Sequence, residues 1–180
     1  MESSNRKTKV TLDTGCVNTK PDIHLDQIFD LHEKGKIELY VPDGVLKDIL
    51  NKKFNLSNID SLPNNPSGIK VKQRLRKIEK CYAIRGSLIC GDDVYGRVGG
   101  TSGGKNVEAY EEKIKKIINS NYDYEDIRIL MLHLSAQNDL FITKNTRHFV
   151  LNGKREAFLK ELIVVIKTPD EFISYFEKSS

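Results

Sequence analysis

The chain has 180 residues, 38% of them hydrophobic and 30% charged, with a formal net charge of +4 at pH 7. This length fits one domain with a substantial core and argues against two large ones. The mild positive charge permits nucleic-acid binding without requiring it. Three cysteines without metal-ligand spacing suit a reducing compartment. We expect a cytoplasmic protein without a signal peptide or membrane association, because the N-terminus is polar and no apolar run reaches the roughly 18 residues that a bilayer requires.

Apolar residues switch between strand-like runs and helical spacing along most of the chain. In chain order we predict a disordered tail at 1–8, a strand at 9–12, a helix at 22–34, a strand at 37–41, a helix at 42–53, helices at 69–82, 108–119 and 123–137, strands at 140–143 and 162–166, and a last helix at 169–176. The run 162–166 is apolar without alternation, which indicates a strand covered on both faces. This order predicts an α/β fold with three layers, in which helices cover both faces of a mostly parallel sheet.

The middle of the chain does not continue this pattern. A single domain is predicted over 9–180, and the segment of about 57–118 is interpreted as an elaboration between two clear strand–helix units. Within it, residues 86–104 are rich in glycine, which predicts a mobile loop.

Acidic and amide residues occur at positions where a parallel sheet places its ligands. Asp13 directly follows the first strand, and Asn145 follows the strand at 140–143. Asp126 is expected in the first turn of the helix that leads into that strand, and Asp48 on the helix after the second strand. Because ligand sites form outside the carboxyl ends of parallel strands, we expect these four side chains to converge.

Converging carboxylates repel one another, and a hard divalent cation relieves that repulsion. Mg²⁺ takes oxygen ligands, retains several waters and stabilises charge on a phosphoryl oxygen. The chemistry expected of this site is hydrolysis of a phosphodiester, with the Thr143 hydroxyl placed to hold a water molecule of the metal.

Four short motifs resemble those of PIN-domain proteins. They are Val10–Thr14, with its Asp13, Val41–Asp48, Asp126–Leu130, and Phe141–Phe149, with its Thr143 and Asn145. The resemblance covers 9–50 and 121–176. It implies an endoribonuclease dependent on Mg²⁺ or Mn²⁺, and partners that include RNA, an antitoxin-type protein or a second copy of the chain.

Under this resemblance Asp13 and Asp126 are the principal metal-holding acids. Asp48 would orient the nucleophile or hold a water molecule of the metal, and Asn145 and Thr143 would be secondary. Asp48 stands where the family usually has Glu, and Asn145 where many members have Asp. These departures motivate the alternative, a catalytically weak RNA-binding or protein-binding module on the same fold.

Other features have both a functional and a structural interpretation. The basic stretch over 70–80 is a candidate RNA surface, although such runs are more often solvated helix faces. Residues 99–105 have the spacing of a phosphate-binding loop, but Asn106 replaces the metal-binding Ser or Thr. His133 is interpreted as a core residue, and His148 as a residue that packs or caps its loop.

Overall fold

The computed structural model describes residues 6–17, 22–43, 45–84, 103–119 and 124–179, without the side chains of 48, 103–108 and 179. The described helices are α1 (Ile23–Glu33), α2 (Val45–Ile49), η1 (Leu50–Phe54, a π-helical turn), η2 (Ile59–Ser61, a 3₁₀ turn), α3 (Pro66–Glu79), α4 (Gly103–Ile118), α5 (Tyr124–Ala136), α6 (Thr146–Phe149), α7 (Lys154–Leu162) and α8 (Pro169–Ser179). Among these described helices, none combines the length and the apolar character that crossing a membrane would require.

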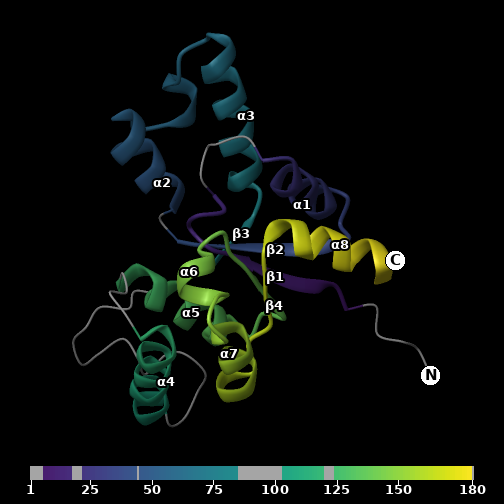
Figure 1. The fold of residues 1–180 in the computed structure, drawn as a ribbon. Helices are drawn as coiled ribbons and strands as arrows, with labels where there is room; N and C mark the ends of the chain where they lie inside the picture. The colour runs from purple at the N-terminus through teal and green to yellow at the C-terminus, as the bar shows by residue number, and fades with distance from the viewer. Residues whose placement is uncertain (1–5, 18–21, 44, 85–102, 120–123, 180) are drawn as a thin grey trace.

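A five-stranded parallel sheet forms the centre of the molecule, in the order β3-β2-β1-β4-β5. The strands are β1 (Thr8–Leu12), β2 (Ile37–Pro42), β3 (Tyr82–Ile84), β4 (Leu140–Ile142) and β5 (Ile166–Lys167). Helices lie on both sides of this sheet (Figure 1). The predicted three-layer α/β fold with a parallel sheet is therefore confirmed.

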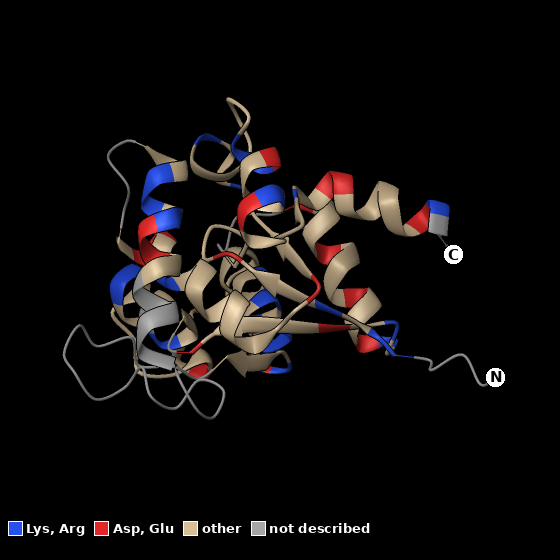
Figure 2. Ribbon diagram, turned by 90° about the horizontal axis from the view of Figure 1, so that it is seen from below, with Lys and Arg blue, Asp and Glu red and all other residues tan. Residues whose placement is uncertain are grey.

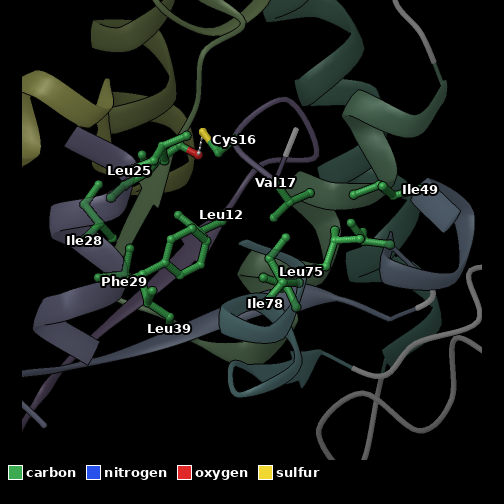
Figure 3. Close-up of a cluster of buried hydrophobic side chains, with 14 of the residues drawn as sticks. Leu12, Cys16, Val17, Leu25, Ile28, Phe29, Leu39, Ile49, Leu75 and Ile78 are labelled. Atoms are coloured by element: carbon green, nitrogen blue, oxygen red, sulfur yellow. Dashed lines mark hydrogen bonds between the residues drawn. The ribbon is translucent and has the colours of Figure 1, made fainter. Parts of the chain in front are cut away.

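One face of the sheet is covered by α1, α8 and the segment from α2 to α3 (Figure 1). Side chains from α1 meet Leu12 of β1 and Leu39 of β2 in the cluster drawn in Figure 3, where Leu75 of α3 also packs. The same cluster contains Cys16, whose thiol donates to the Ile142 carbonyl at 3.5 Å. The chain that follows β1 is thereby held against the end of β4.

The opposite face is covered by α4, α5, α6 and α7. Its core includes a row of aromatic rings that runs from the sheet outward: Phe141 of β4, Phe149 of α6 and Phe158 of α7, with ring centroids 5.3 Å and 5.8 Å apart. All three rings are fully buried. β4 contributes side chains to both cores and therefore packs against both helical layers.

Local signals explain where α1 begins and ends. The Asp22 carboxylate accepts hydrogen bonds from the backbone N–H groups of His24 and Leu25, each at 3.1 Å, which is the N-cap arrangement. Lys144 also donates to Asp22 at 2.5 Å, so this cap is tied to the loop after β4. At the other end Gly35 takes φ +67°, a conformation that glycine adopts without steric cost.

The structure differs from the prediction around the sheet edges. β2 extends through Pro42, so this proline ends a strand and does not begin a helix. Both β3, with two of its three residues exposed, and α7 were missed by the prediction. The predicted strand over 162–166 is wrong at its start, because Leu162 ends α7 and β5 begins only at Ile166.

The run around 163 also alternates, contrary to the prediction. Ile163 is 84% exposed and takes φ +58°, whereas Val164 is buried, Val165 is exposed and Ile166 is buried. Since β5 is an edge strand, only one side of this segment faces the core.

Candidate functional site

Asp13 lies where β1 leaves the sheet. Its backbone N–H donates to the Ile142 carbonyl at 2.8 Å, and its own carbonyl accepts from the N–H of Cys16 at 2.8 Å. These bonds fix the turn after β1 against the end of β4. The Asp13 side chain is consequently 3% exposed, at the carboxyl edge of the sheet.

A chain of hydrogen bonds fixes the Asp13 carboxylate. The N–H of Asn145 donates to the hydroxyl of Thr143 at 2.9 Å, and that hydroxyl donates to Oδ2 of Asp13 at 2.7 Å. Thr143 follows β4 directly and is fully buried. Its hydroxyl therefore positions Asp13, while the predicted contact with a water molecule of the metal stays a prediction.

Burial is the main cause that raises the pKa of Asp13 to about 6, and the nearby negative charge of Asp126 adds to it. The hydrogen bond from Thr143 and the backbone N–H groups of Thr14 and Gly15 act in the opposite direction. Since burial still prevails, the described residues around Asp13 do not fully compensate the charge of its ionised carboxylate. A cation beside Asp13 and Asp126 would supply it.

Asp126 reaches the same edge from the first turn of α5, and it is 9% exposed. Its carboxylate contacts Nδ1 of His148 and both its oxygens lie 3.2 Å from Nδ2 of Asn145. The orientation of the Asn145 amide follows from the N-cap of α6, because its Oδ1 accepts the N–H of His148 at 3.2 Å. Asn145 thus donates to Asp126, and its oxygen is engaged by α6.

A cavity of about 330 Å³ joins these side chains. Asp13, Asp126 and Asn145 all contribute to its wall, together with Val45 and Ile49 of α2. Thr143 is close to the cavity through Asp13 but does not line it. The structure thus brings together four of the five predicted site residues.

The fifth residue, Asp48, belongs to α2 between Val45 and Ile49. The structure describes its backbone but not its side chain. Most of the glycine-rich phosphate-loop candidate at 99–105 lies outside the described residues. The predicted roles of these residues stay predictions.

Four charged residues of the cavity wall were missed by the sequence prediction. They are Lys52 and Lys53 of η1 and Glu125 and Arg128 of α5. The two lysines could have been predicted from the sequence, since they follow Ile49 by three and four residues and so continue the helical face of Val45 and Ile49. The contact of His148 with Asp126 was also missed, because α6 has only four residues and shows no periodicity.

The donor set suits Mg²⁺ or Mn²⁺ bound through two carboxylates and water. Mg²⁺ usually binds one or two protein carboxylates and retains several waters, which Asp13, Asp126 and this cavity can accommodate. Within the described ranges, no group of three or more His, Cys, Asp or Glu side chains is arranged to hold a metal ion. A metal at this site would therefore depend on Asp13 and Asp126, with water or substrate oxygens completing its coordination.

The basic stretch over 70–80 packs against α1 through ion pairs. Arg74 pairs with Asp26 at 2.8 Å, Lys77 with Asp30 at 2.6 Å and Lys80 with Glu33 at 2.9 Å. Arg76 pairs with Asp60 and with Glu79. Much of its charge is thus compensated by acids, which favours the structural interpretation over an RNA surface.

His133 is buried among apolar side chains on α5. Its Nδ1 lies 2.9 Å from the hydroxyl of Thr11 in β1, and burial lowers the pKa of His133 to about 4. The imidazole is neutral at pH 7 and contributes to packing between α5 and the sheet. This agrees with the interpretation of His133 as a core residue.

Comparison with known proteins finds no family model, no curated protein and no solved structure that matches this chain. The PIN-domain resemblance therefore depends on the four motifs alone.

Proposed function

We propose that this chain is a metal-dependent endoribonuclease of the PIN type. The observation that supports this most is that Asp13 and Asp126, distant in sequence, share one cavity at the carboxyl edge of a parallel sheet. The raised pKa of Asp13, to about 6, supports a site that accepts a cation. The choice of RNA as substrate comes from the motif resemblance.

Each residue of the site has a distinct task in this proposal. Asp13 and Asp126 would hold Mg²⁺ or Mn²⁺. When bound, the ion would stabilise charge on a phosphoryl oxygen and activate water for attack on phosphorus. Thr143 holds the Asp13 carboxylate in place, while Asn145 and His148 orient Asp126. Asp48 keeps its predicted task of orienting the nucleophile, one helical turn from Val45.

The test is cleavage of a labelled single-stranded RNA with Mn²⁺ and with EDTA. The wild type should cleave only with Mn²⁺, and Asp13→Asn and Asp126→Asn should each reduce cleavage to the EDTA background because each removes a charged ligand. Calorimetric titration with Mn²⁺ should show the same loss of binding. Asp60→Asn is the matched control, since Asp60 is exposed and pairs with Arg76 outside the cavity. An Asp13→Asn variant that cleaves at the wild-type rate would contradict the proposal.

The alternative function is an RNA-binding or protein-binding module with weak catalysis. The contacts that favour it are those of Asp126, whose carboxylate is already bound by His148 and Asn145. Binding of the same RNA without any EDTA-sensitive cleavage would favour this alternative.

A further inference from the structure

The cavity has a second chemical character beside its carboxylates. Lys52 and Lys53 of η1 line it on one side, and Arg128 of α5 lines it as well. Both lysines are exposed, whereas Asp13 is almost fully buried. The site therefore combines a buried acidic floor with a rim that carries three basic residues and the exposed Glu125.

The fold fixes the two lysines at this rim. α2 begins soon after β2 ends, and its residues Val45 and Ile49 form part of the cavity wall. The helix then widens into the π-helical turn η1, which keeps Leu50 buried in the core while Lys52 and Lys53 lie at the cavity. π-helical turns are rare and occur frequently at functional sites. The turn ends at Asn55, which takes φ +52° and closes the helix.

The rim differs in its surroundings from the other concentration of basic residues. On α3 the ladder of Arg74, Lys77 and Lys80 is matched by acids of α1 that pack against it. Lys52, Lys53 and Arg128 line a space large enough for a ligand, and Arg128 also pairs there with Glu125 at 3.0 Å. Basic and acidic residues are spread over many of the helices in Figure 2, so an overall charge asymmetry does not explain this rim.

A ligand that suits an acidic floor and a basic rim has several negative charges at regular spacing. One phosphate over the floor would meet Asp13 and Asp126 with their cation, and a neighbouring phosphate would meet the rim. A cavity of about 330 Å³ is at the small end of ligand pockets, which favours a segment of one strand over a duplex.

We propose that Lys52 and Lys53, together with Arg128, form a phosphate-binding subsite that holds the backbone phosphate next to the one positioned over Asp13 and Asp126. This inference rests on the proposed function for the phosphate at the floor, but binding at the rim needs no cleavage. Lys52 and Lys53 would attract the phosphate through their charge, and they would take no part in the cleavage step, which depends on Asp13 and Asp126.

The test is the affinity of a labelled single-stranded RNA oligonucleotide, measured in EDTA over a series of salt concentrations. Lys52→Gln/Lys53→Gln should weaken binding about tenfold at low salt and should reduce the slope of log affinity against log salt by about 1.4, because each phosphate contact on a single strand contributes about 0.7. Lys52→Arg/Lys53→Arg keeps the charge and should bind as the wild type does.

The matched control is Lys70→Gln/Lys160→Gln, which removes two exposed lysines that lie outside the cavity wall. It should leave the affinity and the salt slope close to those of the wild type. Equal losses in both double variants, an unchanged slope in Lys52→Gln/Lys53→Gln, or a wild type that does not bind would each overturn the subsite.

Calorimetric titration with Mn²⁺ separates this inference from the proposed function. Lys52→Gln/Lys53→Gln should bind Mn²⁺ as the wild type does and should keep its thermal midpoint. A wild type that binds the oligonucleotide through the rim but neither binds Mn²⁺ nor cleaves would refute the nuclease and leave the subsite supported.

Discussion

Asp13 lowers the stability of the metal-free protein at neutral pH. Burial raises its pKa from 3.8 to about 6 in the folded state, a difference of about two pKa units. Each pKa unit corresponds to about 1.4 kcal/mol, so keeping Asp13 ionised costs about 3 kcal/mol. The hydrogen bond from Thr143 reduces this cost but does not remove it.

Replacing Asp13 with Asn should therefore stabilise the protein without metal. The folded state retains its proton between pH 3.8 and about 6 while the unfolded state loses it, so the stability of the wild type falls as the pH rises through this window. Above about pH 6, Asp13→Asn should be more stable than the wild type by up to about 3 kcal/mol. Below pH 4 the free energies of unfolding of variant and wild type should converge. Urea unfolding in EDTA at several pH values measures this difference.

Asp60→Asn is the control at the same scale. The Arg76 guanidinium lowers the pKa of Asp60, so this substitution should leave stability at pH 7.5 unchanged or slightly reduced. An Asp13→Asn variant that is no more stable than the wild type at pH 7.5 would show that the folded protein compensates the buried charge by itself.

Asp13 and Asp126 were predictable from sequence, whereas the task of Asn145 was not. An acid directly after a buried strand, and another in the first turn of a helix, are placed by backbone periodicity alone. The cap on α6 engages the oxygen of the Asn145 amide, and the contact of its nitrogen with Asp126 depends on how α5 packs beside the end of β4. No periodic signal in the sequence encodes it.

At the scale of elements, α1 and α3 are joined by a ladder of ion pairs. Asp26, Asp30 and Glu33 occupy one face of α1, and they pair with Arg74 and Lys77 of α3 and with Lys80 just after it. Lys77→Glu should place a carboxylate opposite Asp30 and destabilise the protein by about 1 kcal/mol, because both side chains are only partly exposed and like charges would then meet. Urea unfolding at low salt measures the change.

The reciprocal change provides the control for this pair. Asp30→Lys combined with Lys77→Glu restores opposite charges and should recover most of the lost stability, and the double-mutant cycle should give a favourable coupling of about 0.2–1 kcal/mol. Stabilities that are simply additive would show that the Asp30–Lys77 pair makes no contribution of its own.

The elements that the sequence predicted well are those with a clear period or a strong cap. Both α1, between Asp22 and Gly35, and the nearly all-apolar α5 belong to this group. β3 is three residues long and two of them are exposed, so it shows no alternation. Around Ile163 the exposed and buried positions are all apolar, and the alternation that marks an edge strand is therefore invisible in the sequence.

At the scale of the whole molecule, the candidate site lies where the two helical layers meet across the sheet. Asp13 follows β1 in the layer of α1, while Asp126 belongs to α5 in the opposite layer. Asn145 and Thr143 come after β4, whose side chains reach both cores. A ligand shared by the two carboxylates would connect the loop after β1 with α5 of the opposite layer.

Binding of Mn²⁺ should therefore slow amide hydrogen exchange in both layers together. We expect protection at residues 13–17 and in the first two turns of α5, since an ion held by Asp13 and Asp126 stabilises both against local opening. The amides of α8, which packs on α1 away from the cavity, provide an internal reference that should not change. Asp126→Asn should abolish protection in both segments at once. Protection confined to one segment in the wild type would mean that the two carboxylates do not share an ion.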